Sequence, residues 1–404
     1  LLLDDANTGG LDEMLSALDA HPNIELRLFN PFANRGFRLG DFATDFSRVN
    51  HRMHNKSFTA DNQASIVGGR NVGNEYFGAD PHVGFQDLDV LAVGPVVQEV
   101  SREFDAYWND AGAYPVASLV RAEPAEASRA LLEQRWAKVR DDPEAQRYVQ
   151  AVRETSLMRD LLEGRLDLEW AQAHVIADDP GKVRQRGERT ELLLLPRLAQ
   201  AMGRPAKELD LVSPYFVPGK EGTRGLSELA KSGVQVRVLT NSLSATDVGP
   251  VHAGYSKYRE DLLRAGVHLY ELKRSATGLP SKAQERHRGP GSSSDVSLHA
   301  KSFGVDRVRI FVGSFNLDPR SAHLNTEMGI VIESPVLASR LSDELTQETP
   351  EEAFELRLAP EGRGIEWIER TPEGEKRYTS EPKVGVLRRM WVEFLSWLPI
   401  EWLL

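Results

Sequence analysis

The chain contains His54-Asn55-Lys56-Ser57-Phe58-Thr59-Ala60-Asp61 with Gly68-Gly69-Arg70-Asn71, and repeats the pattern as His299-Ala300-Lys301-Ser302-Phe303-Gly304-Val305-Asp306 with Gly313-Ser314-Phe315-Asn316. Both copies follow the spacing His-x-Lys-x4-Asp-x6-Gly-[Gly/Ser]-x-Asn. Six positions that recur at identical spacing in one chain are not a coincidence. Each half of the chain therefore supplies the same group of side chains, and we expect the two groups to form one shared site.

The repeat extends into the flanking sequence. Each half shows a strand, a helix and a second strand, in that order. The expected ranges are 1–5, 11–18 and 24–29 in the first half, and 234–239, 258–263 and 267–272 in the second. Alternating strands and helices favour an α/β fold. We expect two related domains, each a mixed β-sheet flanked by helices, around a pseudo-twofold axis.

The second half carries one further unit, a strand over 209–213, a loop over 214–219 and a helix over 226–231. No counterpart precedes Leu1. Three interpretations remain open: the first half has lost a strand and a helix, these elements lie outside the sequence given, or the two halves have diverged. In the first two cases the first domain is truncated at its N-terminus.

Composition changes along the chain indicate the domain boundaries. Residues 177–188 are rich in charges and helix breakers, so we place the boundary there and assign 1–182 and 183–404 to the two domains. The polar stretch over about 117–169 favours a helical insertion in the first domain. Segments 365–369 and 376–379 flank Pro372 and Gly374 and predict a hairpin.

The last twenty residues predict an amphipathic helix that ends before Pro399. One expected face carries Val384, Leu387, Trp391, Phe394, Leu395 and Leu398, with Val386, Met390 and Trp397 beside it. Tryptophan and arginine are typical of helices that lie at a membrane interface. A helix that packs on the core of the second domain would show the same pattern, and the sequence does not separate the two.

Charge and cysteine content exclude several classes of site. The net charge is −11 and the chain has no cysteine, which excludes disulfides, thiolate metal sites and a cysteine nucleophile. The acidic balance argues against a nucleic-acid partner. No apolar run reaches the length of about 18 residues that a bilayer-spanning helix needs.

The repeated residues suit chemistry on a phosphate. Alternate side chains of a strand share a face, so His54 lies beside Lys56 and His299 beside Lys301. The glycine turns let an anion approach backbone N–H groups, and they add further candidates for binding phosphate: Gly69, Asn71, Ser314 and Asn316. Two imidazoles and two ammonium groups around one phosphate allow a displacement at phosphorus with no metal and no cofactor: one histidine attacks and the other protonates the leaving oxygen.

Each histidine also needs an acceptor that holds its second ring nitrogen. We expect Glu327 to serve the second motif and Asp87 the first. Asp61 and Asp306 complete the two motifs and stand among the candidate catalytic residues, although their positions at strand ends favour a role in holding the turns.

The paired motifs resemble those of the phospholipase D superfamily, in which two His-Lys-Asp motifs form one active site. The first copy resembles a bacterial cardiolipin synthase of the C type. Further segments add to this resemblance: Pro214-Tyr215-Phe216-Val217-Pro218-Gly219, Asn325-Thr326-Glu327 and Leu395-Ser396-Trp397-Leu398-Pro399-Ile400-Glu401-Trp402. Gly69 stands where many members of the superfamily have serine.

The resemblance implies two phospholipase D-like domains and a transfer of a phosphatidyl group to phosphatidylglycerol, with phosphatidylethanolamine as donor. It implies that His54 is the nucleophile and His299 the acid and base, although near-symmetry allows the reverse. It also implies a peripheral protein on the cytoplasmic side of a bacterial inner membrane. A phospholipase D hydrolase and, less favoured, a phosphodiesterase or nuclease would use the same residues. A lipid-binding module without activity would need one motif to have decayed, and both are intact.

Overall fold

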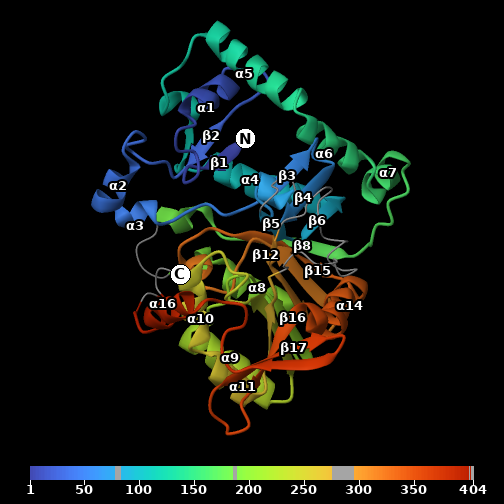
Figure 1. Ribbon diagram of the computed structural model, residues 1–404. Helices are drawn as coiled ribbons and strands as arrows, with labels where there is room; N and C mark the ends of the chain where they lie inside the picture. The colour runs from blue at the N-terminus through green and yellow to red at the C-terminus, as the bar shows by residue number, and fades with distance from the viewer. Residues whose placement is uncertain (78–82, 185–188, 275–294, 400, 402–404) are drawn as a thin grey trace.

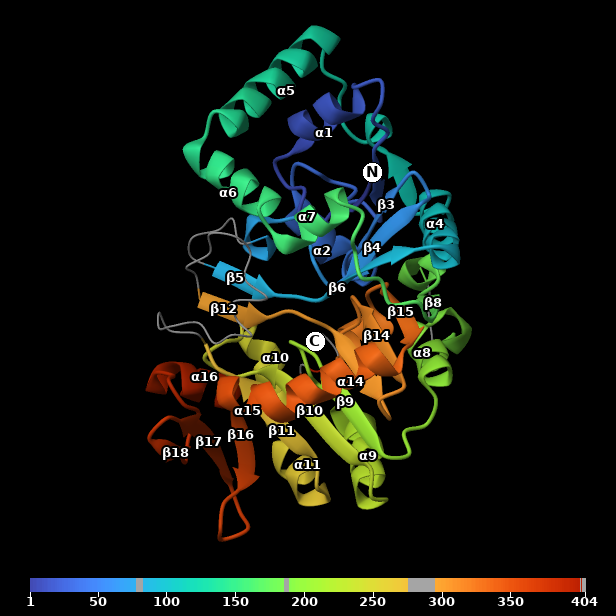
Figure 2. The ribbon, with the colours of Figure 1, turned by 90° about the vertical axis from the view of Figure 1, so that its right-hand side faces the viewer.

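The computed structural model describes residues 1–77, 83–184, 189–274, 295–399 and 401. The chain forms two halves that lie one above the other in Figure 1, the first half at the top and the second half below. Figure 2 shows the same division from the side, with strands of both halves meeting at the middle of the molecule. The region between the halves is therefore built from segments far apart in sequence.

The second half contains a sheet of ten strands in the order β18-β17-β16-β11-β10-β9-β13-β14-β15-β8. Strands β9, β10 and β11 are parallel, and the other neighbours are antiparallel. The strands are β8 (Gln172–Ala177), β9 (Glu208–Val212), β10 (Gln235–Asn241), β11 (His268–Leu272), β13 (Ser302–Val305), β14 (Arg309–Gly313), β15 (Met328–Glu333), β16 (Ala353–Leu358), β17 (Ile365–Thr371) and β18 (Gly374–Tyr378). The last two form the hairpin expected from the sequence.

Helices cover one face of this sheet, and the first half covers much of the other. The first face packs against α8 (Leu194–Met202), α9 (Gly219–Lys231), α10 (Gly249–Ser256) and α11 (Arg259–Ala265) around one apolar core. The second face packs against α14 (Pro335–Asp343) and against first-half residues such as Val67 and Val96. A shared core of this kind fixes the two halves against each other. Short helices α13 (Pro319–His323) and α15 (Thr349–Glu352) complete this half.

The first half has two separate three-stranded sheets, β1-β2-β7 and β3-β4-β6. Their strands are β1 (Leu2–Asp4), β2 (Arg27–Phe29), β7 (Ala113–Pro115), β3 (Ser57–Ala60), β4 (Ala64–Gly68) and β6 (Asp89–Val93). In the second half β9 lies between β10 and β13, whereas no strand of the described residues joins β1 to β3. Phe58 is consequently 67% exposed, while its counterpart Phe303 is 4% exposed.

The helices of the first half lie mainly around its outer side. They are α1 (Asp12–Asp19), α2 (Arg38–Thr44), α3 (Phe46–Val49), α4 (Pro95–Trp108), α5 (Ala125–Arg140), α6 (Pro143–Arg153) and α7 (Ser156–Leu162). The last three form the helical insertion that the sequence predicts, and α5 lies over α1 at the top of Figure 1. The Ser16 hydroxyl accepts the backbone N–H of Glu123, which ties the start of this insertion to α1.

The domain boundary predicted after residue 182 needs a correction. Strand β8 pairs with β15 along its whole length, from Gln172 opposite Glu333 to Ala177 opposite Met328. The chain therefore enters the second sheet at Gln172, before the breaker-rich segment. That segment begins in the protein interior, since Asp178 and Lys182 are both buried. Asp178 and Lys182 pair with each other in the interior, so the charged composition of this segment misled the prediction.

The C-terminal helix α16 (Val386–Ser396) packs one side on the second half and exposes the other, and the faces differ in part from those expected. Val392 and Leu395 are buried against Leu243 and Ala253 of the second half. Leu387, by contrast, is 84% exposed. A period of 3.6 residues places Val392 and Leu395 on the same face and turns Leu387 away from it. In the described part of the chain, no helix is long and apolar enough to cross a bilayer.

We predict unequal effects on stability from two leucines of α16. Leu395→Ala removes buried apolar volume and should lower the free energy of unfolding by about 2–4 kcal/mol. Leu387→Ala should change it by less than about 0.5 kcal/mol, since this side chain is already in solvent. Urea unfolding followed by circular dichroism measures both. Equal effects would contradict the packing of α16 on α10.

Candidate active site

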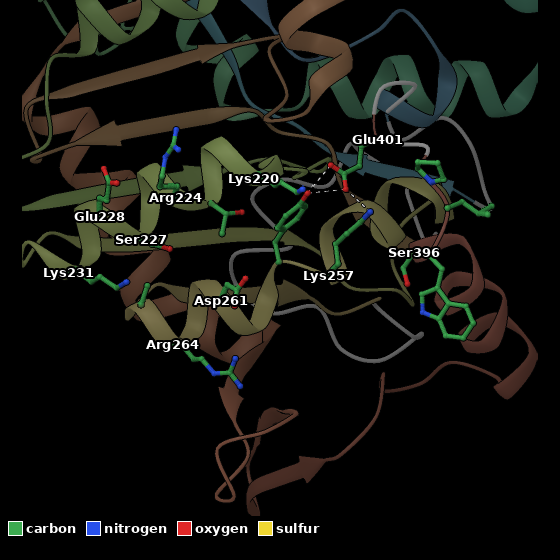
Figure 3. Close-up of a pocket in the computed structure, with 16 residues that line it drawn as sticks. Lys220, Arg224, Ser227, Glu228, Lys231, Lys257, Asp261, Arg264, Ser396 and Glu401 are labelled. Atoms are coloured by element: carbon green, nitrogen blue, oxygen red, sulfur yellow. Dashed lines mark hydrogen bonds and ion pairs between the residues drawn. The ribbon is translucent and has the colours of Figure 1, made fainter.

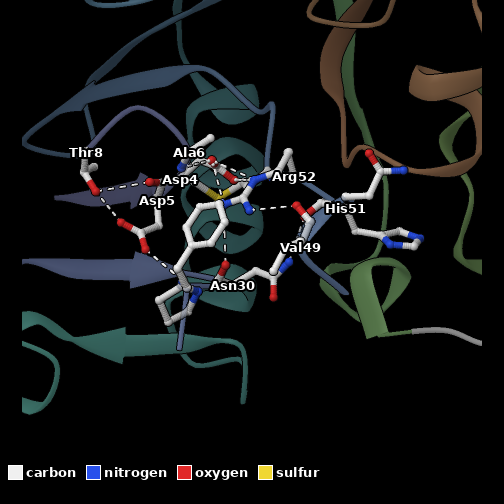
Figure 4. Close-up of polar contacts among 12 residues, drawn as sticks. Asp4, Asp5, Ala6, Thr8, Asn30, Val49, His51 and Arg52 are labelled. Carbon is white, nitrogen blue, oxygen red and sulfur yellow. Dashed lines mark hydrogen bonds and ion pairs between the residues drawn. The ribbon is translucent and has the colours of Figure 1, made fainter. Parts of the chain in front are cut away.

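The segment that leads to His54 is held by polar groups of the first sheet. The Asp4 carboxylate accepts the backbone N–H of Met53 at 2.8 Å and the Arg52 guanidinium at 3.0 Å. The Asn30 amide donates to the backbone oxygen of His51 at 2.7 Å. Figure 4 shows Asp4, Asn30 and Arg52 around this segment. The backbone before His54 is thus fixed by side chains at the ends of β1 and β2.

A carboxylate of the second half holds the His54 ring. The backbone N–H of His54 donates to the oxygen of Thr326 at 2.9 Å, and the N–H of Thr326 donates to the oxygen of Arg52 at 2.9 Å. This short parallel pairing brings the next residue, Glu327, to the imidazole. His54 Nδ1 donates to Glu327 Oε2 at 2.8 Å. The second ring nitrogen, Nε2, keeps its lone pair.

A carboxylate of the first half holds the His299 ring. Strand β12 (Asp295–Leu298) runs parallel to β5 (Val83–Gln86), and the N–H of His299 donates to the oxygen of Gln86 at 2.7 Å. Asp87 follows Gln86, and His299 Nδ1 donates to Asp87 Oδ2 at 2.6 Å. The buried Asn241 amide bonds both backbone groups of Leu298. The end of β12 is therefore fixed from two sides.

The pairing of histidines and carboxylates corrects the sequence prediction. Glu327 and Asp87 do hold the two rings. However, Glu327 holds His54 of the first motif and Asp87 holds His299 of the second, which is the reverse of the prediction. The reason lies in the two parallel pairings across the halves, which align each histidine with the residue before the carboxylate of the opposite half. A sequence pattern shows which groups repeat but not which half they face.

The Gly69–Ser314 difference between the motifs follows from the two carboxylates. A Cβ at Gly69 would overlap the carboxylate of Asp87. On the opposite side the longer Glu327 leaves room for Ser314, whose hydroxyl donates to Glu327 Oε2 at 2.5 Å. Asp87 thus leaves space only for glycine at position 69, whereas Glu327 leaves space for serine at position 314.

Both motif lysines lie in the site and have lowered pKa values. Lys56 Nζ donates to the backbone oxygen of His54 at 2.5 Å, and Lys301 donates to the backbone oxygen of His299. Burial lowers the pKa of Lys56 to about 7, against the opposing effect of Glu327, and that of Lys301 to about 8, against that of Asp87. The charge of Lys301 also bears on Lys56, so the two half-sites act on each other.

Burial also changes the pKa values of the histidines. It lowers the pKa of His54, and Glu327 partly offsets this effect. Burial, with the charges of Lys301 and Lys56, lowers the pKa of His299 well below its usual value. Both rings are therefore neutral near pH 7, so an unprotonated Nε2 is available for attack on phosphorus.

The two motif asparagines differ in their surroundings. Asn71 donates to the Tyr76 hydroxyl at 2.8 Å. Tyr76 stacks on Phe85 at 4.8 Å and lies edge-on to His299 at 4.9 Å between ring centroids. The carbonyl oxygen of buried Asn316 has no hydrogen-bond partner among the described residues. The aromatic contacts to His299 were not foreseen from the sequence, since neither ring belongs to the repeated pattern.

The motif aspartates are the candidates that stay outside the site. Asp306 accepts the backbone N–H groups of Ala206, Lys207 and Glu208, and Asp61 is exposed at the turn between β3 and β4. Both have positive φ, of 53° and 52°. They hold turns, which is the role that their positions at strand ends favoured.

A buried group behind Glu327 was also missed. Asp178 Oδ2 accepts the backbone N–H of Glu327 at 2.8 Å and the Lys182 ammonium at 3.0 Å. Ser321 donates to Glu327 Oε1 at 2.8 Å. Burial raises the pKa of Asp178 to about 6. The Asp-x3-Lys spacing was visible in the sequence, but it resembled a solvated charged loop.

One further cluster has ligand types that suit a metal. His252, Glu271 and Glu381 bring their ligand atoms within 4.8 Å of one another. The Arg259 guanidinium lies among them, 3.0 Å from Glu271 and 2.7 Å from Glu381. A buried cation already balances these carboxylates, so the cluster is an ion-pair network between α10, α11, β11 and the C-terminal segment.

Comparisons with known proteins agree with this geometry. A family model described as "Cardiolipin synthase, PLD-like domain" matches residues 198–349. Cardiolipin synthase C of Escherichia coli (strain K12) is 44% identical over 408 residues, which cover 100% of this chain and 84% of that protein. Cardiolipin synthase A of Pseudomonas aeruginosa (strain UCBPP-PA14) is 27% identical over 331 residues, 81% of this chain and 52% of that protein.

A solved structure shares the fold. The phosphatidylserine synthase of Haemophilus influenzae Rd KW20 aligns with a TM-score of 0.51 and 14% identity, covering 92% of this chain and 70% of that one. At this identity the likeness concerns the fold alone. This shared fold and the identity to cardiolipin synthase C over the whole of this chain both agree with the two-domain architecture around the paired motifs. The chain therefore belongs to the cardiolipin synthase family of the phospholipase D superfamily.

Proposed function

We propose that this phosphatidyltransferase makes cardiolipin by moving a phosphatidyl group from phosphatidylethanolamine to a glycerol hydroxyl of phosphatidylglycerol. The observation that carries the proposal is the crosswise site, in which each imidazole has a carboxylate from the other half at Nδ1. Two imidazoles and two ammonium groups are what a double displacement at phosphorus needs. Its family relation supports phosphatidyl transfer as the reaction.

In the first step His54 Nε2 attacks the phosphorus of the donor lipid. A P–N bond forms, the P–O bond to ethanolamine breaks, and His299 gives its proton to the departing oxygen. Lys56 and Lys301 balance the negative charge on the non-bridging oxygens. The bound phosphodiester offsets the lysine charges that lower the pKa of His299, so its protonated form becomes accessible in the complex.

In the second step the acceptor reverses these events. His299, now neutral, takes the proton of a glycerol hydroxyl of phosphatidylglycerol. The oxygen attacks phosphorus, a P–O bond forms and the P–N bond to His54 breaks. Water in place of the lipid alcohol would give phosphatidic acid, which is the hydrolase alternative.

Differences between the two half-sites support this proposed assignment of roles. The His54 side chain is 25% exposed and that of His299 is 6% exposed, so the first is more open to substrate. Burial alone would raise the pKa of Glu327, but His54, Lys56 and Ser314 hold it below its usual value. Burial raises the pKa of Asp87. An ionised carboxylate behind His54 makes its Nε2 the better nucleophile.

We also propose that the protein binds peripherally to the cytoplasmic side of a bacterial inner membrane, where both lipids are available. Phosphatidylglycerol and phosphatidylethanolamine are its proposed partners, and nucleic acid is not. The net charge of −11 disfavours a polyanionic substrate and so disfavours the nuclease alternative.

The function is tested with the purified chain and defined lipids. We expect cardiolipin from phosphatidylglycerol mixed with phosphatidylethanolamine, and less from phosphatidylglycerol alone, as measured by mass spectrometry. Release of ethanolamine should match the cardiolipin formed, because donor cleavage and transfer are coupled. Phosphatidic acid as the sole product would instead support the hydrolase.

The roles of the histidines are separated by a donor whose leaving group needs no proton, phosphatidyl-p-nitrophenol. His299→Gln should lower cardiolipin formation from natural lipids by about 100-fold or more, yet still release p-nitrophenol in a burst that leaves a phosphatidyl group on the protein. His54→Gln should form no covalent species with either donor. A covalent adduct in His54→Gln and none in His299→Gln would reverse the assignment.

The lowered lysine pKa values set a limit at high pH. A lysine with a lowered pKa is charged below that pKa and neutral above it, so kcat/KM should fall as the pH rises through about 7 to 8. Lys56→Arg keeps its charge and should move this fall to higher pH, although the shape of the site changes. A rate constant that stays level to about pH 9 in the unchanged protein would contradict the lysine pKa values.

A further inference from the structure

Helix α16 presents a row of large apolar side chains to solvent. Its buried side, Val392 and Leu395, packs on α10. The exposed residues are Val386, Leu387, Met390, Trp391, Phe394 and Trp397, each between 49% and 84% exposed. Trp391 and Phe394 lie 5.8 Å apart between ring centroids, which makes a continuous aromatic surface. A row of apolar side chains on a solvent-exposed surface is typical of an interaction site.

A groove with an excess of basic groups lies at the C-terminal end of this helix. It has a volume of about 970 Å³ and runs between α9, α11 and residues 396–399 and 401. It is lined by the five basic residues Lys220, Arg224, Lys231, Lys257 and Arg264, and by the three acidic residues Glu228, Asp261 and Glu401. Figure 3 shows these side chains around the groove.

The charges of this groove are partly unbalanced. Lys257 pairs with Glu401 at 2.5 Å, Arg264 with Glu260 at 3.2 Å and Arg224 with Glu221 at 3.7 Å. Among the described residues, Lys220 and Lys231 form no ion pair, and neither do the lining carboxylates Glu228 and Asp261. In a chain whose net charge is −11, a lining of five cations and three carboxylates beside an exposed apolar helix is a local exception. The combination matches an anionic lipid surface, where headgroups meet cations and acyl chains meet apolar side chains.

The same helix contacts the rim of the active site. Arg388 donates to the backbone oxygen of Thr246 at 2.9 Å. The next residue, Asp247, accepts the Tyr215 hydroxyl at 2.9 Å, and its charge acts on the pKa of Lys301. A lipid surface bound by α16 would therefore lie next to the loop that borders the site.

We infer that α16 and the adjacent basic groove dock the protein on a bilayer that contains anionic phospholipid. The apolar side chains of α16 enter the acyl region, and Lys220 and Lys231 bind anionic headgroups. The inference rests on the proposed function insofar as the docked lipids are also the substrates. The docking itself is measured without turnover.

Vesicle co-sedimentation tests the surface with two probes, vesicles of phosphatidylcholine alone and vesicles of phosphatidylcholine and phosphatidylglycerol in equal amounts. Leu387→Glu with Trp391→Glu should weaken binding to both kinds by tenfold or more. Lys220→Glu with Lys231→Glu should weaken binding about fivefold per lysine on the anionic vesicles alone. Trp136→Glu is the matched control, since this tryptophan is 65% exposed on α5 and should leave binding unchanged.

Two further measurements separate the possible outcomes. All three variants should keep the melting temperature of the unchanged protein, because the altered side chains are exposed. Cardiolipin formation from short-chain lipids dissolved as monomers should persist in the α16 variant. If neither the unchanged protein nor any variant forms cardiolipin from these lipids, the result contradicts the proposed function and leaves the docking inference standing.

Unchanged vesicle binding in the α16 variant would overturn the inference. A second outcome would also overturn it. If the unchanged protein sediments as a dimer, while the α16 variant sediments as a monomer and binds vesicles fully, the exposed face of α16 joins two copies of the chain.

Discussion

The structure of the site depends on one interaction made twice, the hydrogen bond from a histidine Nδ1 to a carboxylate of the opposite half. His54 is bound to Glu327 and His299 to Asp87. Neither half holds its own imidazole in a defined tautomer. The apolar core shared by the two halves is therefore a requirement of the site as well as of stability, because a small shift between the halves would separate both pairs.

The symmetry of these two pairs is incomplete, and the differences are chemically useful. Asp87 fills the space that a serine side chain would need at position 69, whereas Glu327 accepts hydrogen bonds from Ser314 and Ser321. Two carboxylates in different surroundings acquire opposite pKa shifts. Different environments for chemically similar groups are the usual way in which one site separates a nucleophile from an acid.

The proposed access to lipid rests on helix α16. Helix α16 uses its small buried side to rest on α10 and turns its larger apolar side outward. Through Arg388 it contacts the loop that carries Asp247, close to Lys301. The proposed membrane surface and the proposed chemistry are thus joined by a few residues of the second half, while the helical insertion of the first half lies elsewhere.

The sequence by itself determined the duplicated architecture, the four histidine and lysine residues of the site and both carboxylates, because repeats in a chain reflect repeats in a fold. Two strands of the first half were also predicted, β1 and β2, and in the second half β9, β10, β11, β17 and β18. Asp178 and Lys182 were not recognised from the sequence, and β8 was placed on the wrong side of the boundary. Only the tertiary structure decided which carboxylate faces which histidine and which side of α16 is buried. These depend on contacts between segments far apart in the chain, and local patterns carry no information about such contacts.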